Sequence, residues 1–226
     1  MHGGPRPTLP EELLLLCADP VSGRLRRPRN FNRVLGGALL AELLLAGAVT
    51  VEGRRITGVR PIPTGGPADG LLAALSAAGG KRGRGPRLDP WVRRASVRAD
   101  RPHLDALEAR GLLTARRRRI LGILPSTVYT AVGHAGVQAR AVHLLHGLAA
   151  DAPGGPTAAH DLPDLRDLHL AALLGAARLD RRLVRGPGAR TVHRHVRELV
   201  RATPIADAVR RVLQSDESAA ASGSGA

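Results

Sequence analysis

Two groups of arginines in this sequence have the residue type and spacing that could recognise phosphate. The first group is Arg98 and Arg101, which would share one face if their segment is helical. A guanidinium offers several donors in a planar fork, so two of them on one face could converge on a single phosphate group. The alternative is that both side chains lie in water at the start of an exposed helix.

The second group is a run of consecutive arginines that leads into aliphatic residues: Arg116, Arg117, Arg118, Arg119, Ile120 and Leu121. On a membrane, the arginines would contact lipid phosphates while the aliphatic side chains enter the acyl boundary. Alternatively, alternate residues of a hairpin would pack inward while the others lie in water. A wing that contacts DNA is the third interpretation.

The chain as a whole is strongly basic, with 34 Lys and Arg residues, 19 Asp and Glu residues and a formal net charge of +15. Such a charge creates a positive field that attracts polyanions, either nucleic acid or an anionic lipid surface. Cys17 is the only cysteine, which excludes a disulfide framework. The aromatic residues are only Phe31, Trp91 and Tyr129, so the core must consist of Leu, Ala and Val.

Motifs for enzymatic chemistry are missing from the sequence. Gly80 and Lys81 resemble the end of a phosphate-binding loop, but the glycine five residues earlier and the following Ser or Thr are absent. One cluster has the residue types of metal ligands: His160, Asp161, Asp164, Asp167 and His169. Its acidic residues are expected instead to cap the helix that follows Pro163. We therefore predict no catalytic activity, no cofactor and no metal site.

Apolar spacing and turn signals predict a mainly helical protein with one or two protruding β-hairpins. The segment 32–47 is apolar nearly all round, as expected of a helix at the centre of a bundle. Further helices are expected at 68–78, 98–111, 137–149, 165–184, 191–202 and 204–213, with hairpins at 48–59 and 112–129. This gives a flexible N-terminus at 1–8, a single helical domain at 9–213 and a disordered tail at 214–226.

The order of several segments resembles the Golgi phosphoprotein 3 family. The matching stretches are LPEELLLL at 9–16, GALLAEL at 37–43, PTG at 63–65, Trp91, LEARGLLT at 107–114 and LAALLGAARLD at 170–180. Each motif is loose by itself, but together they cover most of residues 9–213 in a fixed order.

The resemblance implies a helical core with a protruding hairpin, here 114–129, which serves membrane contact and self-association. It also implies a pocket for phosphatidylinositol 4-phosphate, built from a Trp and several basic residues, and a role in recruiting membrane proteins. Two of the basic positions look like Arg98 and Arg101. Where the family has its Trp and first Arg, this sequence has Arg27 and Gly36. The resemblance therefore implies that Arg27 or Arg33 supplies charge instead, with a general preference for anionic lipid.

Taken together, these observations predict a non-enzymatic protein that binds anionic phospholipid headgroups, with membrane-protein tails and a second copy of itself as further partners. The first ten residues are polar and do not resemble a secretory signal, so we expect a cytoplasmic protein associated peripherally with a membrane. The alternative is a winged-helix DNA-binding protein. Asp105 and Glu108 argue against it, because acidic residues on the helix before the hairpin would repel phosphates.

Overall fold

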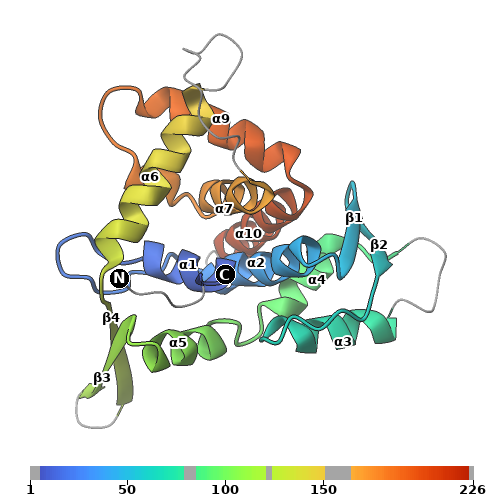
Figure 1. Ribbon diagram of the computed structural model, residues 1–226, viewed down its shortest axis with the longest axis horizontal. Coiled ribbons are helices and arrows are strands. Elements are labelled where there is room, and N and C mark those ends of the chain that lie inside the picture. The colour runs from blue at the N-terminus through green and yellow to red at the C-terminus, as the bar shows by residue number, and fades with distance from the viewer. Residues whose placement is uncertain (1–5, 79–84, 121–123, 151–163, 224–226) are drawn as a thin grey trace.

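A buried helix, α2 (Phe31–Leu45), forms the centre of the protein in a computed structural model that describes residues 6–78, 85–120, 124–150 and 164–223. Four helices make the most extensive contacts with it: α1 (Leu9–Leu16), α4 (Leu88–Ala95), α7 (Leu165–Ala176) and α10 (Pro204–Gly223). Figure 1 shows α2 running through the middle of the molecule, with these helices on different sides of it. The predicted central helix is thus confirmed, and its apolar circumference is explained by neighbours on most of its faces.

Smaller elements surround this centre. They are α3 (Ala68–Ala78), α5 (Asp100–Ala109), α6 (His134–Ala150), α8 (Asp180–Leu183) and α9 (Ala189–Ala202). Helices α6, α7 and α9 pack against one another, while α5 packs against α1. The predicted fold class, a mainly helical domain, is confirmed.

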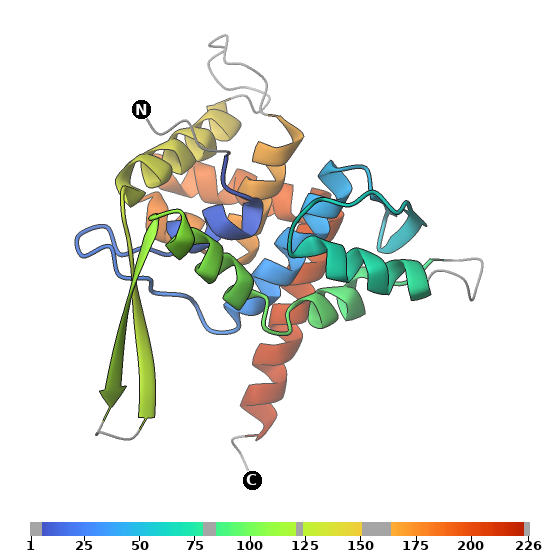
Figure 2. The ribbon, with the colours of Figure 1, turned by 60° about the horizontal axis from the view of Figure 1, so that its bottom comes forward.

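Two antiparallel hairpins complete the fold, as the sequence predicted. The first pairs β1 (Val49–Glu52) with β2 (Arg55–Val59), and its register shifts by one residue after Thr50. The second pairs β3 (Leu113–Ile120) with β4 (Leu124–Ala131) in an unbroken register from Leu113 opposite Ala131 to Ile120 opposite Leu124. This second hairpin projects from the helical body in Figure 2.

The core consists almost entirely of Leu, Ala and Val side chains, with Phe31 and Trp91 as its buried aromatics. Leu13, Leu35 and Leu173 illustrate this, since each is completely buried in its helix. The low aromatic content therefore does not prevent a continuous core. It is filled by many small and branched side chains instead.

Two buried acidic residues join α1 to the rest of the domain. Glu11 accepts hydrogen bonds from the backbone amide of Thr8 and from Arg110, both at 2.9 Å. Glu12, only 4% exposed, pairs with Arg140 and Arg166. These carboxylates do more than complement the helix dipole, because each is compensated by an arginine that is distant in sequence.

Two predicted boundaries are wrong. The helix expected at 165–184 ends at Ala176, because Arg178 has a left-handed backbone with φ of +58° and the amide of Leu179 bonds back to Leu174. The tail expected to be disordered from 214 continues as helix α10 to Gly223. Its Asp216 and Glu217 make ion pairs with the body of the protein, and its three alanines favour helix.

The N-terminal segment predicted to be flexible is only partly described, since residues 1–5 lie outside the structure's described ranges. Within the described part, the Arg6 guanidinium lies 2.8 Å from a carboxylate oxygen of Asp167.

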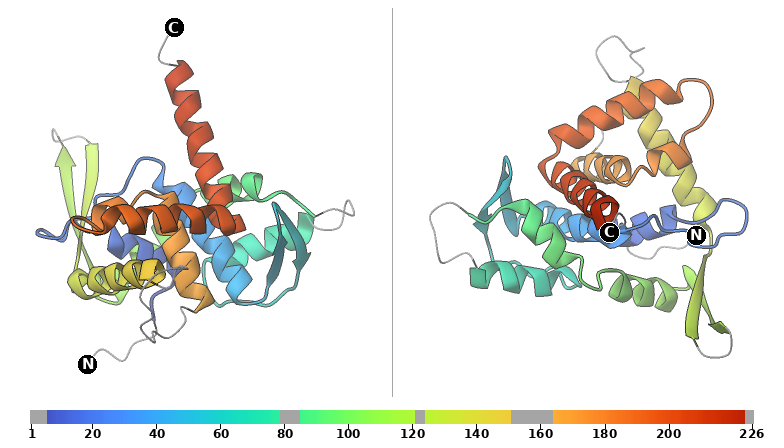
Figure 3. Two further views of the ribbon diagram at one scale, coloured as in Figure 1. Left: turned by 90° about the horizontal axis from the view of Figure 1, so that it is seen from above. Right: turned by 180° about the vertical axis from the view of Figure 1, so that it is seen from behind.

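Figure 3 shows that the last turns of α10 project from the body on the same side as the β3–β4 hairpin.

Candidate functional site

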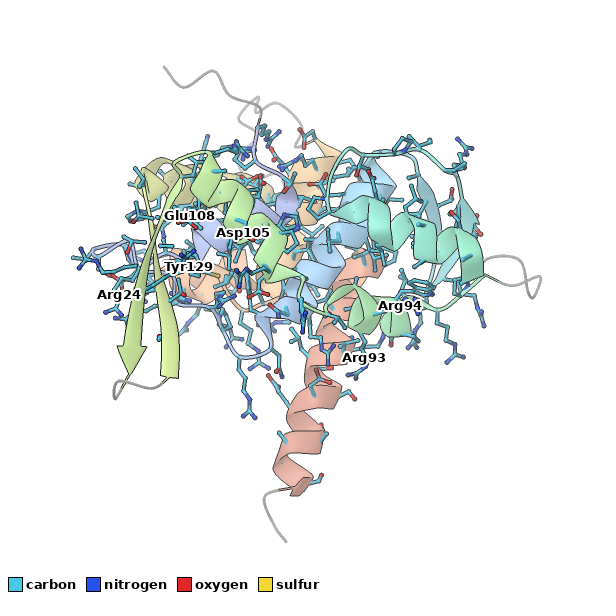
Figure 4. The ribbon with its side chains drawn as sticks, turned by 90° about the horizontal axis from the view of Figure 1, so that it is seen from below. Arg24, Arg93, Arg94, Asp105, Glu108 and Tyr129 are labelled. Atoms are coloured by element: carbon cyan, nitrogen blue, oxygen red, sulfur yellow. The ribbon has the colours of Figure 1, made fainter. Side chains whose placement is uncertain are left out.

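A basic segment, residues 24–33, connects the base of the β3–β4 hairpin to the first turn of α2. At the hairpin, the amide of Leu25 donates to the carbonyl of Tyr129 at 3.0 Å. Figure 4 shows Arg24 and Tyr129 close together at this junction. The amide of Arg26 donates to the carbonyl of Cys17 at 2.8 Å, which fixes the segment beneath α1. These backbone contacts position the arginines of the segment that precede α2.

A cavity of about 550 Å³ lies where this segment enters α2; we call it the α2 cavity. It is lined by Arg27, Pro28, Asn30, Phe31, Asn32, Arg33, Ser96 and Asp100. The wall opposite the basic segment is the junction between α4 and α5, which supplies Ser96 and Asp100. Two of the four arginines that the sequence predicted to bind a headgroup, Arg27 and Arg33, thus lie on one cavity.

The N-terminus of α2 opens into this cavity. Asn30 occupies the cap position with a left-handed backbone, φ of +58°, and its side chain makes no capping hydrogen bond. The first turn of α2 contains no acidic residue. Because the first amides of a helix carry partial positive charge, this end of α2 adds to the positive potential of the arginines. The arrangement favours an anion in the cavity.

Two carboxylates compete for the cavity arginines. Arg27 forms an ion pair of 2.5 Å with Asp100 on the opposite wall. Arg33 donates from Nε to Asp216 of α10 at 2.8 Å, and Arg93 pairs with the same carboxylate. Both arginines remain partly accessible, with side-chain exposures of 35% for Arg27 and 28% for Arg33. A ligand phosphate would therefore exchange with carboxylates at this site rather than meet free guanidinium groups.

The expectation that Arg98 and Arg101 share a helix face is wrong. Arg98 lies before α5 with a left-handed backbone, φ of +52°, so helical spacing does not set the direction of its side chain. Arg101 is on α5, where it is 73% exposed and 3.4 Å from Asp105. Neither residue lines the α2 cavity. They are near it in sequence, because Ser96 and Asp100 on its wall come from the same junction.

The sequence was compared with models of known protein families. Residues 9–215 match the model of Golgi phosphoprotein 3 (GPP34). The chain belongs to this family. A search of individually curated proteins found no match. Phosphoinositide-binding, non-catalytic peripheral membrane proteins are characteristic of the GPP34 family.

Gly36 is buried on α2, on the side that packs against α4. A Cβ atom built on it would lie 2.6 Å from the carbonyl oxygen of Val92 and 2.8 Å from Oγ of Ser96. A long side chain therefore does not fit here while α2 and α4 remain in contact. Arg33, one helical turn earlier, is the basic residue of α2 that reaches the cavity.

The predicted membrane-contact hairpin is confirmed as a hairpin, but its arginines are not on one face. Arg116 lies opposite Val128 and Arg117 opposite Thr127 in the β3–β4 register. Successive residues of a strand point to opposite faces, so Arg116 and Arg117 point in opposite directions. Arg118, Arg119 and Ile120 belong to the strand, but their side chains lie outside what the structure describes, as does the whole of Leu121. No described helix is long and apolar enough to cross a membrane.

The cluster with metal-ligand residue types has a structural explanation in its described part. Asp164 caps α7, accepting a hydrogen bond of 2.7 Å from the amide of Asp167. His169 is buried in α7, and burial lowers its pKa. His160 and Asp161 lie outside the described residues. Among the residues that are described, no group of three potential ligands could hold a metal ion.

Sequence reasoning missed the acidic partners of the two cavity arginines and the start of α2 that lines the α2 cavity. Asp100 could not be assigned to Arg27, because they are 73 residues apart in sequence. Asp216 was assigned to a disordered tail. The signal for the open helix end was present, since Asn30 precedes the apolar run and no acidic residue follows it in the first turn.

Proposed function

We propose that this GPP34 protein docks on the surface of an anionic membrane and holds a lipid headgroup phosphate in the α2 cavity. The observation that carries the proposal is the convergence on one cavity of Arg27, Arg33 and the start of α2, which has no side-chain cap and no acidic residue in its first turn. A guanidinium and a helix N-terminus are both groups that proteins use for phosphate. Phosphatidylinositol 4-phosphate is the proposed headgroup, on the strength of family membership.

The proposed orientation places the hairpin tip toward the membrane. The hairpin and the last turns of α10 project on the same side of the molecule in Figures 2 and 3. The basic segment 24–33 runs from the hairpin base to the α2 cavity, so docking would bring hairpin and cavity to the surface together. Arg98 and Arg101 are proposed as outer contacts, since both are exposed, Arg98 just before α5 and Arg101 in its first turn.

The strength of this docking follows from the number of arginines involved. Each basic residue near an anionic surface contributes about 1 kcal/mol, and salt screens the attraction within a Debye length. Two cavity arginines with two outer ones would give binding that is useful but salt-sensitive. Arg116 and Arg117 on the hairpin would add to it.

The test is cosedimentation with three sets of vesicles: neutral, generically anionic, and containing phosphatidylinositol 4-phosphate at equal surface charge. We expect Arg27→Gln with Arg33→Gln to weaken binding to the phosphoinositide vesicles at least tenfold. Arg98→Gln with Arg101→Gln should weaken it by a smaller factor, because these side chains lie outside the cavity. The matched control is Arg190→Gln with Arg194→Gln, which removes the same charge from exposed positions on α9.

Each result has a definite meaning. Equal loss in all three double variants would contradict a headgroup site, because only the net charge would then matter. Preference of the wild type for the phosphoinositide over equally charged vesicles would support specific recognition. Retained vesicle binding by a folded Arg27→Gln, Arg33→Gln variant would refute the α2 cavity as the headgroup site.

Two kinds of protein partner are part of the proposal. Cytosolic tails of membrane proteins are proposed as clients, on the strength of family membership. A second copy of the chain is proposed to pair through the β3–β4 hairpin, and sedimentation velocity with and without vesicles tests this.

Duplex DNA, compared with the vesicles at the same salt concentration, is the ligand that we expect not to bind. Figure 4 shows Asp105 and Glu108 together on α5, where they would repel a phosphate backbone.

A further inference from the structure

A second cavity, of about 500 Å³, lies on the other side of Pro28 from the α2 cavity. The end of α7, the short helix α8, one face of α9 and the middle of α10 enclose it; we call it the α9 cavity. Pro28 lines both cavities, so the segment 24–33 separates them. None of the arginines proposed above to contact a lipid headgroup lines the α9 cavity.

The α9 cavity has a large excess of positive charge. Seven arginines and only two acidic residues line it. Asp180 is already engaged, since Nδ1 of His193 lies 2.8 Å from its Oδ2. Glu217 is engaged at 3.6 Å by Arg178. The acidic residues therefore leave most of the arginine charge uncompensated.

Five of the seven arginines form no ion pair with any residue that the structure describes: Arg29, Arg181, Arg182, Arg197 and Arg201. Arg29 comes from the basic segment, while Arg197 and Arg201 come from α9. Arg197 and Arg201 lie four residues apart on α9, where like charges repel each other. A bound anion would reduce this repulsion. The donors come from several segments and surround the cavity instead of following a single helix.

The size and walls of the α9 cavity indicate the kind of anion. A volume of about 500 Å³ is within the range of small-molecule sites and much larger than one phosphate needs. Val34, Val196 and Val200 line part of it, which provides an apolar surface for the organic part of a ligand. His193 also lines it, with its Nε2 on the side of the ring away from the Asp180 contact.

We propose that the α9 cavity binds a small molecule that carries two adjacent phosphate groups. Arg197 and Arg201 contact one side of the diphosphate and Arg29 the other, because they reach the cavity from different elements. Guanidinium forks suit this ligand, since each can donate two parallel hydrogen bonds to one phosphate. The diphosphate comes either from a soluble metabolite or from a lipid headgroup. The proposal does not depend on the function proposed for the α2 cavity.

The test is titration calorimetry of the full chain with inorganic pyrophosphate, and with orthophosphate for comparison, at 150 mM salt. Wild-type protein should bind pyrophosphate at least tenfold more tightly than orthophosphate. Arg197→Gln with Arg201→Gln should weaken pyrophosphate binding at least tenfold. The matched control is Arg190→Gln with Arg194→Gln, which removes two arginines with the same spacing from the same helix but outside the cavity. It should change the affinity by less than twofold.

Two further variants make the outcome independent of folding and of the α2 cavity. Arg29→Gln alters the cavity at a residue that lies outside the helices, so it tests the site even if the α9 variant unfolds. Arg27→Gln with Arg33→Gln should lose vesicle binding and keep pyrophosphate binding. This pattern separates failure of the α9 cavity from failure of the proposed function.

The source of the ligand is determined with vesicles that contain a lipid with a diphosphate headgroup, for example a polyprenyl diphosphate. Unchanged vesicle binding by Arg197→Gln, Arg201→Gln, together with lost pyrophosphate binding, supports a soluble diphosphate. Loss of both supports a headgroup as the source. Undetectable pyrophosphate binding by the wild type, or equal loss in the α9 variant and its control, would overturn the proposal.

Discussion

Asp216, near the end of the last helix, pairs with Arg33 in the first turn of α2, with 2.8 Å between Oδ2 and Nε. The same carboxylate pairs with Arg93 of α4. Burial would raise the pKa of Asp216, but the hydrogen bonds and charges of Arg93 and Arg33 outweigh it, so the pKa lies below its ordinary value. The carboxylate is therefore ionised at neutral pH. The C-terminal helix thus holds an arginine of the α2 cavity.

Replacing Asp216 should strengthen binding to anionic membranes. In Asp216→Asn, Arg33 and Arg93 lose their shared carboxylate, so a lipid phosphate no longer has to displace it. We expect a two- to fivefold gain in the fraction bound to anionic vesicles, measured by cosedimentation at 150 mM salt. Glu217→Gln is the control, because it removes the adjacent charge, whose partner Arg178 does not line the α2 cavity. Equal gains in both variants would show that only net charge matters.

How well the sequence predicts this site depends on how far apart along the chain the interacting residues lie. The helical centre and both hairpins were predictable, because apolar periodicity and turn residues are local signals. The arginines of the cavity, Arg27 and Arg33, were named from the resemblance to the Golgi phosphoprotein 3 family, because residue type alone does not distinguish them from the other arginines of the chain. The Arg27–Asp100 and Arg33–Asp216 pairs were not predictable, because they join segments 73 and 183 residues apart. The face shared by Arg98 and Arg101 was predicted wrongly, because a left-handed residue interrupts the helix there.

Gly36 should be required for the contact between α2 and α4. In Gly36→Ala, the new Cβ would lie 2.6 Å from the carbonyl oxygen of Val92, so the two helices must separate. Overpacking of this kind costs about 1–3 kcal/mol in the free energy of unfolding, measurable by urea denaturation. Gly70→Ala on α3 is the matched control, because nothing lies within 4 Å of its added Cβ. The control should be neutral or slightly stabilising; similar losses in both variants would disprove the packing argument.

The hairpin should approach the membrane tip first. Arg116 and Arg117 point to opposite faces of β3, so a hairpin lying flat would bring only one of them to the lipid. With the tip inserted, both faces meet headgroups. We therefore expect Arg116→Gln and Arg117→Gln to weaken vesicle binding by a similar factor, roughly fivefold each, from about 1 kcal/mol per arginine. A loss in one variant and none in the other would instead indicate a hairpin that lies flat on the surface.

Stability should fall as the pH drops below neutral, because two histidines are buried as neutral groups. His103 and His169 are only 2% and 4% exposed. Burial lowers the pKa of both, and for His103 the nearby Glu11 partly opposes the effect. A histidine whose pKa is lower in the folded state contributes full stability above the unfolded pKa near 6.5, and this is lost as the pH falls through the folded pKa.

We expect His169 to contribute more to this loss than His103, since no acidic residue opposes the lowering of its pKa. The melting temperature of the wild type should decrease between pH 7.5 and pH 5. In His169→Gln, which keeps a neutral polar side chain at all these pH values, the decrease should be smaller. His143→Gln on α6 is the control, because that histidine is exposed. If His169→Gln and the wild type melt with the same pH dependence, protonation of His169 does not limit acid stability.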